Sequence, residues 1–388
     1  MGYPISVLAP SNPAELADAL RSAASAGQTI SLSGNASKRR MAGPVESADV
    51  TISTLSLRGV MQYEPRDLTI SVAAGLAWRE LTNLLAENRQ MVPLDPPYAA
   101  DATVGGVIAS NSSGPRRRLY GTARDLVIGM HFITLEGKLV QSGGMVVKNV
   151  AGLDMAKLMI GSFGTLAAIA TINFKLQPMP ELERSFLLPF ATLPEAIAAG
   201  NRILRGQLQP AAVDLLNPAA AATLGNSTWL LALRAGGNAA AIDRYEREFA
   251  ALADGVALEE DRQSELWQHV ENFTPTFLAR HTDGAVVRAS CTLKEAEAVM
   301  ESFPGPAIAR AGNGVCYGYF EHSMTAADWM GGAAAKSSKA VVEFAPDRYR
   351  QQMELWPSVG GDFEIMKRVK HLFDPLNLLN RGRLYRRI

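Results

Sequence analysis

The chain has 388 residues, which is enough for about two or three domains with sizeable hydrophobic cores. Thirty-eight basic residues balance thirty-eight acidic ones, so no global field attracts nucleic acid or an anionic membrane surface. The two cysteines, Cys291 and Cys316, form no CxxC motif and no Cys/His cluster, which argues against an iron–sulfur cluster or structural zinc and fits a reducing compartment.

Targeting signals are weak. Residues 1–16 lack both a basic start and an apolar core, so we expect no signal peptide. The longest apolar runs fall well short of the roughly eighteen residues that a membrane span needs. We therefore expect a cytoplasmic protein with no nucleic-acid partner and no direct membrane insertion, which meets a membrane only through partner subunits.

The first part of the chain alternates helices with short strands. Asn12, Pro13 and Glu15 supply an N-cap, a first-turn proline and a capping box, which predicts a helix over residues 13–26. Trp78 and Leu81 lie on one face of a second expected helix, over residues 77–87. Strands are predicted at residues 29–33, 50–55, 68–72 and 167–176, and a hairpin over residues 128–141 that turns at Glu136-Gly137.

Pro178 and Pro180 mark a domain boundary, because two prolines in three residues end regular structure. Beyond them, strand patterns alternate with alanine-rich helices, which predicts an α+β second domain. The strands are expected at residues 186–189, 212–216, 228–233, 285–290 and 341–344, and the helices at 194–204, 239–252, 294–303 and 363–373. The expected domains are residues 1–178, residues 179–355, and a C-terminal segment over residues 356–388.

One glycine run looks like a dinucleotide loop. Residues 312–318 read GNGVCYG, but valine and tyrosines follow the glycines, which favours a turn into a strand over the helix that such a loop requires. The sequence contains no GxxxxGK[ST] motif. Phosphate binding therefore needs another architecture.

Three separated segments rich in small residues suggest that architecture. They are GNASK at residues 34–38, ATVGGVIASNSSG at residues 102–114, and KNVAGLDMAKLMIGSFG at residues 148–164. Glycine, alanine and serine let backbone N–H groups approach a ligand that bulky side chains would hold off. A diphosphate is the obvious candidate ligand.

In order and spacing these segments resemble the FAD-binding domain of the vanillyl-alcohol oxidase and p-cresol methylhydroxylase superfamily, over about residues 5–180. The ending FDPLNLLNRGRL at residues 373–384 is similar to that family's C-terminal return to the flavin. The resemblance implies an α+β protein with a two-subdomain FAD-binding domain of p-cresol methylhydroxylase type and a smaller α+β cap domain.

Within the superfamily, SGPRRRLYGTARDLVIG and GGMVVKNVAGLDMAKLMIGSFG most resemble the E-subunit family of bacterial glycolate oxidases. Such subunits belong to complexes that oxidise glycolate, a small 2-hydroxy acid, to glyoxylate. The resemblance implies two partners, a D subunit with its own FAD and an iron–sulfur F subunit that passes electrons toward the respiratory chain.

Cofactor-binding residues carry over by position. The pyrophosphate loop would be Gly34, Asn35, Ala36, Ser37 and Lys38. The diphosphate and flavin edge would be lined by Ala102, Thr103, Gly105 and Gly106, and then by Ser110, Asn111 and Gly114. The ribityl and adenosine portions would lie near Asp125, Val127, Asn149, Val150, Gly152 and, on the adenine side, Ile169. Arg381 would approach the isoalloxazine from the C-terminus.

Some positions depart from the family or fit a second interpretation. Asn35 and Ala36 stand where glycines are common. Asn149 and Asp154 also fit capping of the helix before Gly161. Residues 116–118, three arginines, fit a solvated turn or a partner face better than a carboxylate-binding pair, because long basic side chains are mostly exposed.

The cofactor loops contain no histidine or cysteine at the family's usual attachment points, so we expect FAD to be bound noncovalently. Oxidation of a 2-hydroxy acid also needs a base and a cation for the carboxylate. The five histidines show no ligand spacing, so the sequence predicts no metal and identifies no catalytic residue. Three interpretations stay open: a flavin-carrying subunit whose partner does the substrate chemistry, which we favour, a stand-alone 2-hydroxy acid dehydrogenase of D-lactate type, and a non-catalytic assembly subunit.

Overall fold

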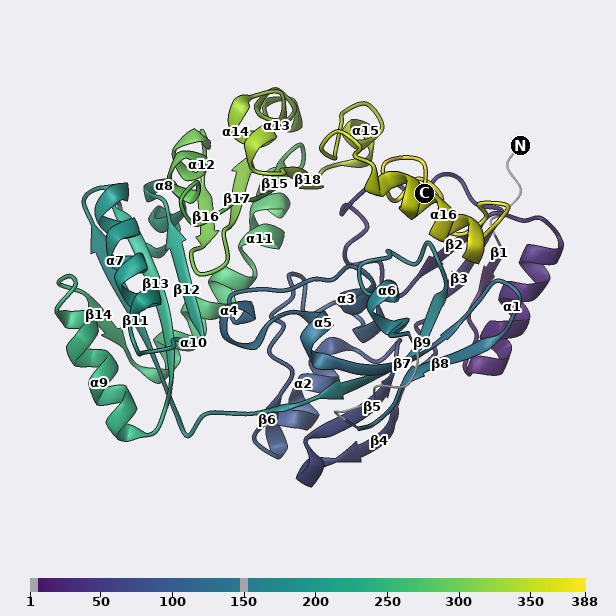
Figure 1. Cartoon of the computed structure of the whole chain (residues 1–388), viewed down its shortest axis with the longest axis horizontal. Coiled ribbons are helices and arrows are strands. Elements are labelled where there is room, and N and C mark those ends of the chain that lie inside the picture. The colour runs from purple at the N-terminus through teal and green to yellow at the C-terminus, as the bar shows by residue number, and fades with distance from the viewer. Residues whose placement is uncertain (1–5, 147–152) are drawn as a thin grey trace. The chain divides into compact units, whose positions relative to one another are not determined.

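Figure 1 shows the computed structural model of the chain, which describes residues 6–146 and 153–388. The chain forms two compact units. The first consists of Met1–Ser113, Thr122–Met179 and Ser358–Ile388, and the second of Gly114–Gly121 and Pro180–Pro357. A short piece from the middle of the glycine-rich sequence therefore belongs to the second unit.

The first unit begins with a three-stranded parallel sheet in the order β1-β3-β2, beside helix α1. Asn12 accepts a hydrogen bond from the Glu15 N–H at 3.0 Å, and Leu16 and Leu20 are fully buried, which confirms the helix predicted there. The bounds are β1 (Ser6–Leu8), α1 (Pro13–Ser25), β2 (Ile30–Ser33) and β3 (Val50–Ser53).

The second sheet of this unit is antiparallel, in the order β4-β5-β9-β7-β8. Its β7–β8 hairpin turns at Gly137, which has a φ of 76°, as the sequence predicts. The strands are β4 (Val60–Glu64), β5 (Thr69–Ala73), β7 (Val127–Ile133), β8 (Leu139–Gly143) and β9 (Ala168–Lys175), with a separate pair β6 (Gln90–Met91) and β10 (Gln177–Pro178). The helices are α2 (Trp78–Glu87), α3 (Val104–Ala109), α5 (Ala123–Leu126), α6 (Ala156–Met159) and α16 (Asp362–Phe373), with a 3-10 turn at Pro65–Asp67.

The second unit is built on one antiparallel sheet in the order β14-β11-β13-β12-β16-β17-β15-β18. Its strands are β11 (Leu182–Phe190), β12 (Ala212–Leu216), β13 (Trp229–Gly237), β14 (Val256–Leu258), β15 (Ala285–Ser290), β16 (Ala307–Arg310), β17 (Val315–Phe320) and β18 (Val341–Phe344). Its helices are α4 (Arg117–Tyr120), α7 (Leu193–Arg205), α8 (Pro218–Ala221), α9 (Ala239–Ala250), α10 (Glu260–Glu271), α11 (Phe273–Arg280), α12 (Ala296–Ser302), α13 (Ser323–Met330), α14 (Ala333–Ser337) and α15 (Asp347–Arg350), with a 3-10 turn at Ala222–Leu224.

The main core of the second unit lies on one face of this sheet, under α7, α9 and α12 (Figure 1). The glycine run 312–318 crosses from β16 into β17, and the two strands pair antiparallel, which confirms the turn interpretation and excludes a dinucleotide loop there. Helix α10 was not predicted, because its polar composition hides a short apolar face that includes Trp267, and α11 was not predicted, because it is short and contains a proline at residue 275.

The mixture of sheets and helices confirms the predicted α+β class. Within the described ranges, no helix is long and apolar enough to cross a membrane.

Candidate cofactor site

The loop that follows β2 lies directly against the segment before α3. A Cβ placed on Gly34 would lie 2.4 Å from Thr103 Oγ1, so only glycine permits this approach. Asn35 reinforces the contact, because its Nδ2 donates to the Asp101 carbonyl at 2.8 Å. Ala36 has a φ of 50°, a conformation that glycine adopts more easily. The structure thus brings the first two predicted segments together.

Lys38 ends this loop with a buried charge. Its side chain is 8% exposed, and its Nζ has no hydrogen-bond partner among the residues that the structure describes. Burial lowers the pKa of Lys38 from 10.5 to about 8. An ammonium group held away from water needs an anion to compensate its charge, so this position suits a diphosphate.

The first three N–H groups of helix α3 donate hydrogen bonds to acceptors of the protein itself. Val104 N–H donates to the Leu76 carbonyl at 2.9 Å, and Gly105 N–H donates to the Ala74 carbonyl at 2.7 Å. Gly106 N–H donates to Thr103 Oγ1 at 3.2 Å. The glycines at 105 and 106 therefore allow close packing of α3 onto the strand-to-helix turn, and their N–H groups are already paired in this structure.

The third predicted segment docks on the far end of α3. Gly161 N–H donates to the Ile108 carbonyl at 3.1 Å, and Phe163 N–H donates to the Ala109 carbonyl at 2.8 Å. Ser110, predicted to continue the cofactor wall, donates its hydroxyl to the Gly106 carbonyl at 2.7 Å, and its role toward a cofactor stays a prediction. The exposed Asn111 has a φ of 49° and ends the helix beside Gly161.

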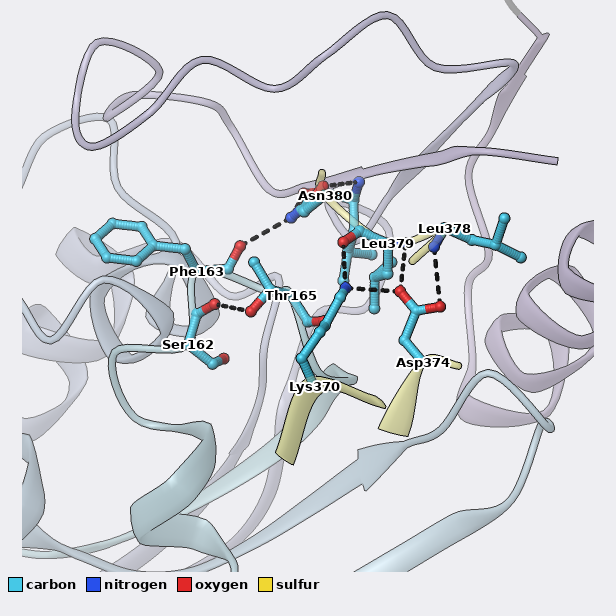
Figure 2. Close-up of polar contacts among 9 residues, drawn as sticks. Ser162, Phe163, Thr165, Lys370, Asp374, Leu378, Leu379 and Asn380 are labelled. Atoms are coloured by element: carbon cyan, nitrogen blue, oxygen red, sulfur yellow. Dashed lines mark hydrogen bonds and ion pairs between the residues drawn. The ribbon is translucent and has the colours of Figure 1, made fainter. Parts of the chain in front are cut away.

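The C-terminal segment crosses β2 and the loop before β9 through one side chain. Asn380 Oδ1 accepts from Leu32 N–H at 2.7 Å, while its Nδ2 donates to the carbonyls of Leu32 at 3.1 Å and Phe163 at 2.8 Å (Figure 2). Because Leu32 lies just before the Gly34–Lys38 loop, Asn380 connects that loop to the third segment. Sequence reasoning did not assign this residue, although it lies beside Arg381 in the recognised C-terminal motif.

A buried ion pair supports the same crossing. Lys370 Nζ lies 2.6 Å from Asp374 Oδ2 and donates to the carbonyls of Thr165 at 2.7 Å and Leu379 at 3.0 Å (Figure 2). The Asp374 carboxylate also accepts from the N–H groups of Leu378 and Leu379. Unlike Lys38, this lysine has its counter-ion and a full set of acceptors.

Four other predicted residues are accounted for by local structure. The exposed Asp125 accepts from Thr122 N–H at 2.8 Å in a capping box. The Val127 carbonyl accepts from Lys157 Nζ at 2.7 Å, and Ile169 is buried in β9. Arg381 forms an ion pair with Glu46 at 3.4 Å. Their roles toward a cofactor stay predictions.

Two groups of predicted residues are not described as part of this assembly. Gly114 belongs to the second unit. The predicted residues Asn149, Val150 and Gly152 lie outside the described residues. Asp154 Oδ1 accepts from Lys157 N–H at 3.4 Å in the first turn of α6, whereas Met155, the residue directly before that helix, makes no side-chain capping hydrogen bond. Among described residues, no group of three or more His, Cys, Asp or Glu is placed to hold a metal ion.

Comparison with known proteins agrees with this geometry. Residues 4–143 match the FAD binding domain family, and residues 351–384 match the C-terminal domain of FAD linked oxidases. The fold is similar to that of p-cresol methylhydroxylase with substrate bound, with a TM-score of 0.75 and 12% identity over 97% of this chain and 88% of that one.

Three proteins of known name are similar to this chain in sequence over part of its length. Glycolate oxidase subunit GlcE of Escherichia coli (strain K12) is 37% identical over 180 residues, which are 46% of this chain and 50% of that protein. Glycolate oxidase subunit GlcD of Bacillus subtilis (strain 168) is 30% identical over 158 residues, or 41% and 34%. D-lactate dehydrogenase of Anaerostipes hadrus is 30% identical over 167 residues, or 43% and 35%.

The chain thus matches half or less of the length of these relatives. The two family matches fall mainly on the first unit and include the Gly34–Lys38 loop, α3, and the C-terminal crossing at Asn380. The chain therefore carries an FAD binding domain, its fold is similar to that of p-cresol methylhydroxylase, and its cofactor is FAD.

Proposed function

We propose that the chain is the FAD-binding subunit of a glycolate oxidase complex, which oxidises glycolate to glyoxylate and passes the electrons to an iron–sulfur subunit. The observation that carries the proposal is the buried Lys38 ammonium, which has no hydrogen-bond partner among the described residues and ends a loop held against the segment before α3. The similarity to GlcE supports the choice of substrate, and the similarity to GlcD supports a second FAD subunit as partner.

In this proposal Lys38 binds the FAD diphosphate, and burial around it excludes the water that would weaken the charge pair. Asn380 keeps the Gly34–Lys38 loop and the Gly161–Gly164 turn in register. FAD, when bound, accepts two electrons from an alcohol and passes them on singly. The base that accepts the proton of the substrate hydroxyl belongs to the partner subunit or to residues other than those named above.

We also propose that FAD is held noncovalently, in the cytoplasm, by a subunit that meets a membrane only through its partners. Purified full-length chain should show a flavin absorbance spectrum, and acid denaturation should release all of the flavin into the supernatant. Flavin that stays with the precipitated protein would contradict the noncovalent assignment.

The decisive experiment adds glycolate anaerobically to the purified chain, with and without the D subunit. Bleaching of this chain's flavin only when the D subunit is present supports the proposal. Bleaching by glycolate or D-lactate in the absence of partners would replace it with the stand-alone dehydrogenase, which the D-lactate dehydrogenase relative favours. A chain that binds no FAD would leave an assembly subunit as its function.

A further inference from the structure

The only two cysteines of the chain, Cys291 and Cys316, are free thiols on neighbouring strands of the second unit. In the β15–β17 pair Ala289 lies directly opposite Cys316, and Cys291 follows Ala289 by two residues. The Cys291 N–H donates to the Gly314 carbonyl at 2.8 Å, which extends the same pairing by one step. Side chains two residues apart on a strand share a face, so the two cysteines are diagonal neighbours on one face of the sheet.

Small residues pair with both cysteines. Cys316 lies between Ala289 of β15 and Ala309 of β16. Opposite Cys291 is Gly314, which has a φ of 65°, and a Cβ placed on it would lie 2.0 Å from the Cys291 carbonyl oxygen. Cys291 Sγ lies 3.5 Å from the Gly314 carbonyl oxygen, so the thiol leans toward β17. Alanine and glycine are too small to separate the two sulfur atoms.

The two thiols differ in their exposure to water. Cys316 is fully buried in the core of the second unit, in the same cluster as Ala289 and Ala309. Cys291 is only partly buried and packs against the edge of that core. An oxidant dissolved in water therefore reaches Cys291 first, and Cys316 reacts only with a group that Cys291 presents to it.

The interaction between the thiols assigns them different chemical roles. A hydrogen bond from the Cys316 thiol lowers the pKa of Cys291, whereas burial and the Glu295 carboxylate raise it. The same hydrogen bond, together with burial, raises the pKa of Cys316 well above its usual range. Because the thiolate is the nucleophilic form of cysteine, Cys291 is the more reactive of the two, and Cys316 keeps its proton.

We propose that Cys291 and Cys316 form a reversible disulfide when the chain meets hydrogen peroxide, with Cys291 as the attacking thiolate and Cys316 as the resolving thiol. In the first step the Cys291 sulfur bonds to one peroxide oxygen, the O–O bond breaks and hydroxide leaves, which gives a sulfenic acid. In the second step the Cys316 sulfur bonds to the Cys291 sulfur, the S–O bond breaks, and the hydroxyl leaves with the Cys316 proton as water. Two thiols are oxidised, and one peroxide is reduced to two waters.

Bond formation requires a small movement of one strand end. Diagonal neighbours on a sheet lie about 7–8 Å apart, whereas the Cα atoms of a disulfide lie about 4.4–6.8 Å apart, so the cysteines must approach by about 1–2 Å. Cys291 is the first residue after β15, and the residues that follow it, 292–295, are exposed and outside the sheet. The movement therefore leaves the rest of the β15–β17 pair in place.

The test adds hydrogen peroxide to the full-length chain, which has no other cysteine, and removes the excess with catalase. Free thiols are then counted after denaturation, and the intact mass is measured. The parent should lose both thiols and about 2 Da while remaining a monomer in non-reducing electrophoresis. Dithiothreitol should restore both thiols by exchange.

Two matched variants separate the roles of the cysteines. Cys316→Ala should stop at the sulfenic acid of Cys291, which dimedone traps as a covalent adduct. Cys291→Ala should leave the buried Cys316, whose reaction with peroxide we expect to be at least about tenfold slower. Circular dichroism and the ratio of flavin to protein absorbance should stay at the parent values in both variants. If a variant fails to fold, the parent result decides, since it needs no substitution.

Retention of both thiols by the peroxide-treated parent would overturn the proposal. A disulfide-linked dimer would also overturn it, as would a gain of about 32 Da on one cysteine without a disulfide. A dimedone adduct on Cys316 in Cys291→Ala, formed as fast as the adduct in Cys316→Ala, would overturn the assignment of Cys291 as the nucleophile. The inference concerns the second unit alone and does not rest on the proposed function.

Discussion

The two units bury cations in opposite ways. In the first unit, burial lowers the pKa of Lys38 to about 8, and no residue that the structure describes accepts a hydrogen bond from its Nζ. In the second unit, Arg310 is buried beside Asp214, and its pKa rises despite burial, since that carboxylate and the nearby tyrosines favour its charged form. A buried cation with its own counter-ion stabilises the fold by remaining paired, whereas one without a counter-ion costs stability until a ligand supplies the charge.

The largest effect on stability is expected when the ion pair between Arg310 and Asp214 is broken. Arg310→Met should lower the free energy of unfolding by about 3–5 kcal/mol, because the fully buried Asp214 is left without its cation. Urea unfolding followed by circular dichroism measures the loss. The double variant Arg310→Met with Asp214→Leu should recover much of it, and a double variant as unstable as the single one would show that packing, and not the orphaned charge, sets the loss.

Replacing Lys38 in the flavin-free protein is expected to increase stability, whereas replacing Arg310 decreases it. Because its pKa is lowered from 10.5 to about 8, the unfolded chain binds more protons than the folded one between these pH values. Lys38 therefore destabilises the fold fully below about pH 8, and the penalty disappears as pH rises toward 10.5. Lys38→Met should be more stable than the parent by about 3 kcal/mol at neutral pH.

Urea titrations of flavin-free parent and Lys38→Met at several pH values measure this difference, in which other titrating groups cancel. The difference should shrink as pH approaches 10.5. A pH-independent difference would show that Lys38 is not the titrating group. Lys138→Met is a suitable control, because Lys138 is exposed at the β7–β8 turn, and it should show no such trend.

A smaller effect, of reversed sign, is expected on FAD affinity. Lys38→Met should weaken FAD binding about 10- to 100-fold, because it removes one charge-assisted contact with the diphosphate. Flavin fluorescence during titration of the stripped protein measures the change, and Lys38→Arg should retain most of the affinity. Parent-like affinity in Lys38→Met would place the diphosphate elsewhere and leave the lone lysine unexplained.

The smallest effect is expected at Asn380. Asn380→Ala removes three hydrogen bonds that join Leu32 to the Phe163 carbonyl but no proposed contact with FAD. We expect roughly a fivefold faster release of FAD, as the Gly34–Lys38 loop loses its register, measured by stopped-flow fluorescence against excess apoprotein. Lys367→Met, an exposed change on α16, should release FAD at the parent rate. Equal release by Asn380→Ala and the parent would make Asn380 purely structural.

Local sequence signals predicted much of the fold. The helix at Pro13 and the hairpin turn at Gly137 appear where their caps and turn residues indicate, because such signals act over a few neighbouring residues. Helices α10 and α11 escaped prediction, since they depend on packing against the sheet through Trp267 and Phe273 more than on their own periodicity.

For the cofactor site, the sequence identified the segments but not how each residue is used. It identified the loop that contains Lys38. It could not show that the Lys38 ammonium is buried with no hydrogen-bond partner among the described residues, because burial depends on residues that are distant in the sequence. It assigned Gly105 and Gly106 to the cofactor edge, which stays a prediction, but it did not show that their N–H groups pair within the protein, because only the packed structure shows which donors are already used.

By itself, then, the sequence determined the α+β class, the FAD-binding type of the first unit and the segments that meet there, since these follow from local patterns and motif order. The tertiary structure alone decided that Arg310 pairs with Asp214, and that Asn380 bridges Leu32 and Phe163. The physical reason is distance along the chain. Charge compensation and side-chain bridging depend on groups brought together from far apart, and no local spacing encodes which of them will meet.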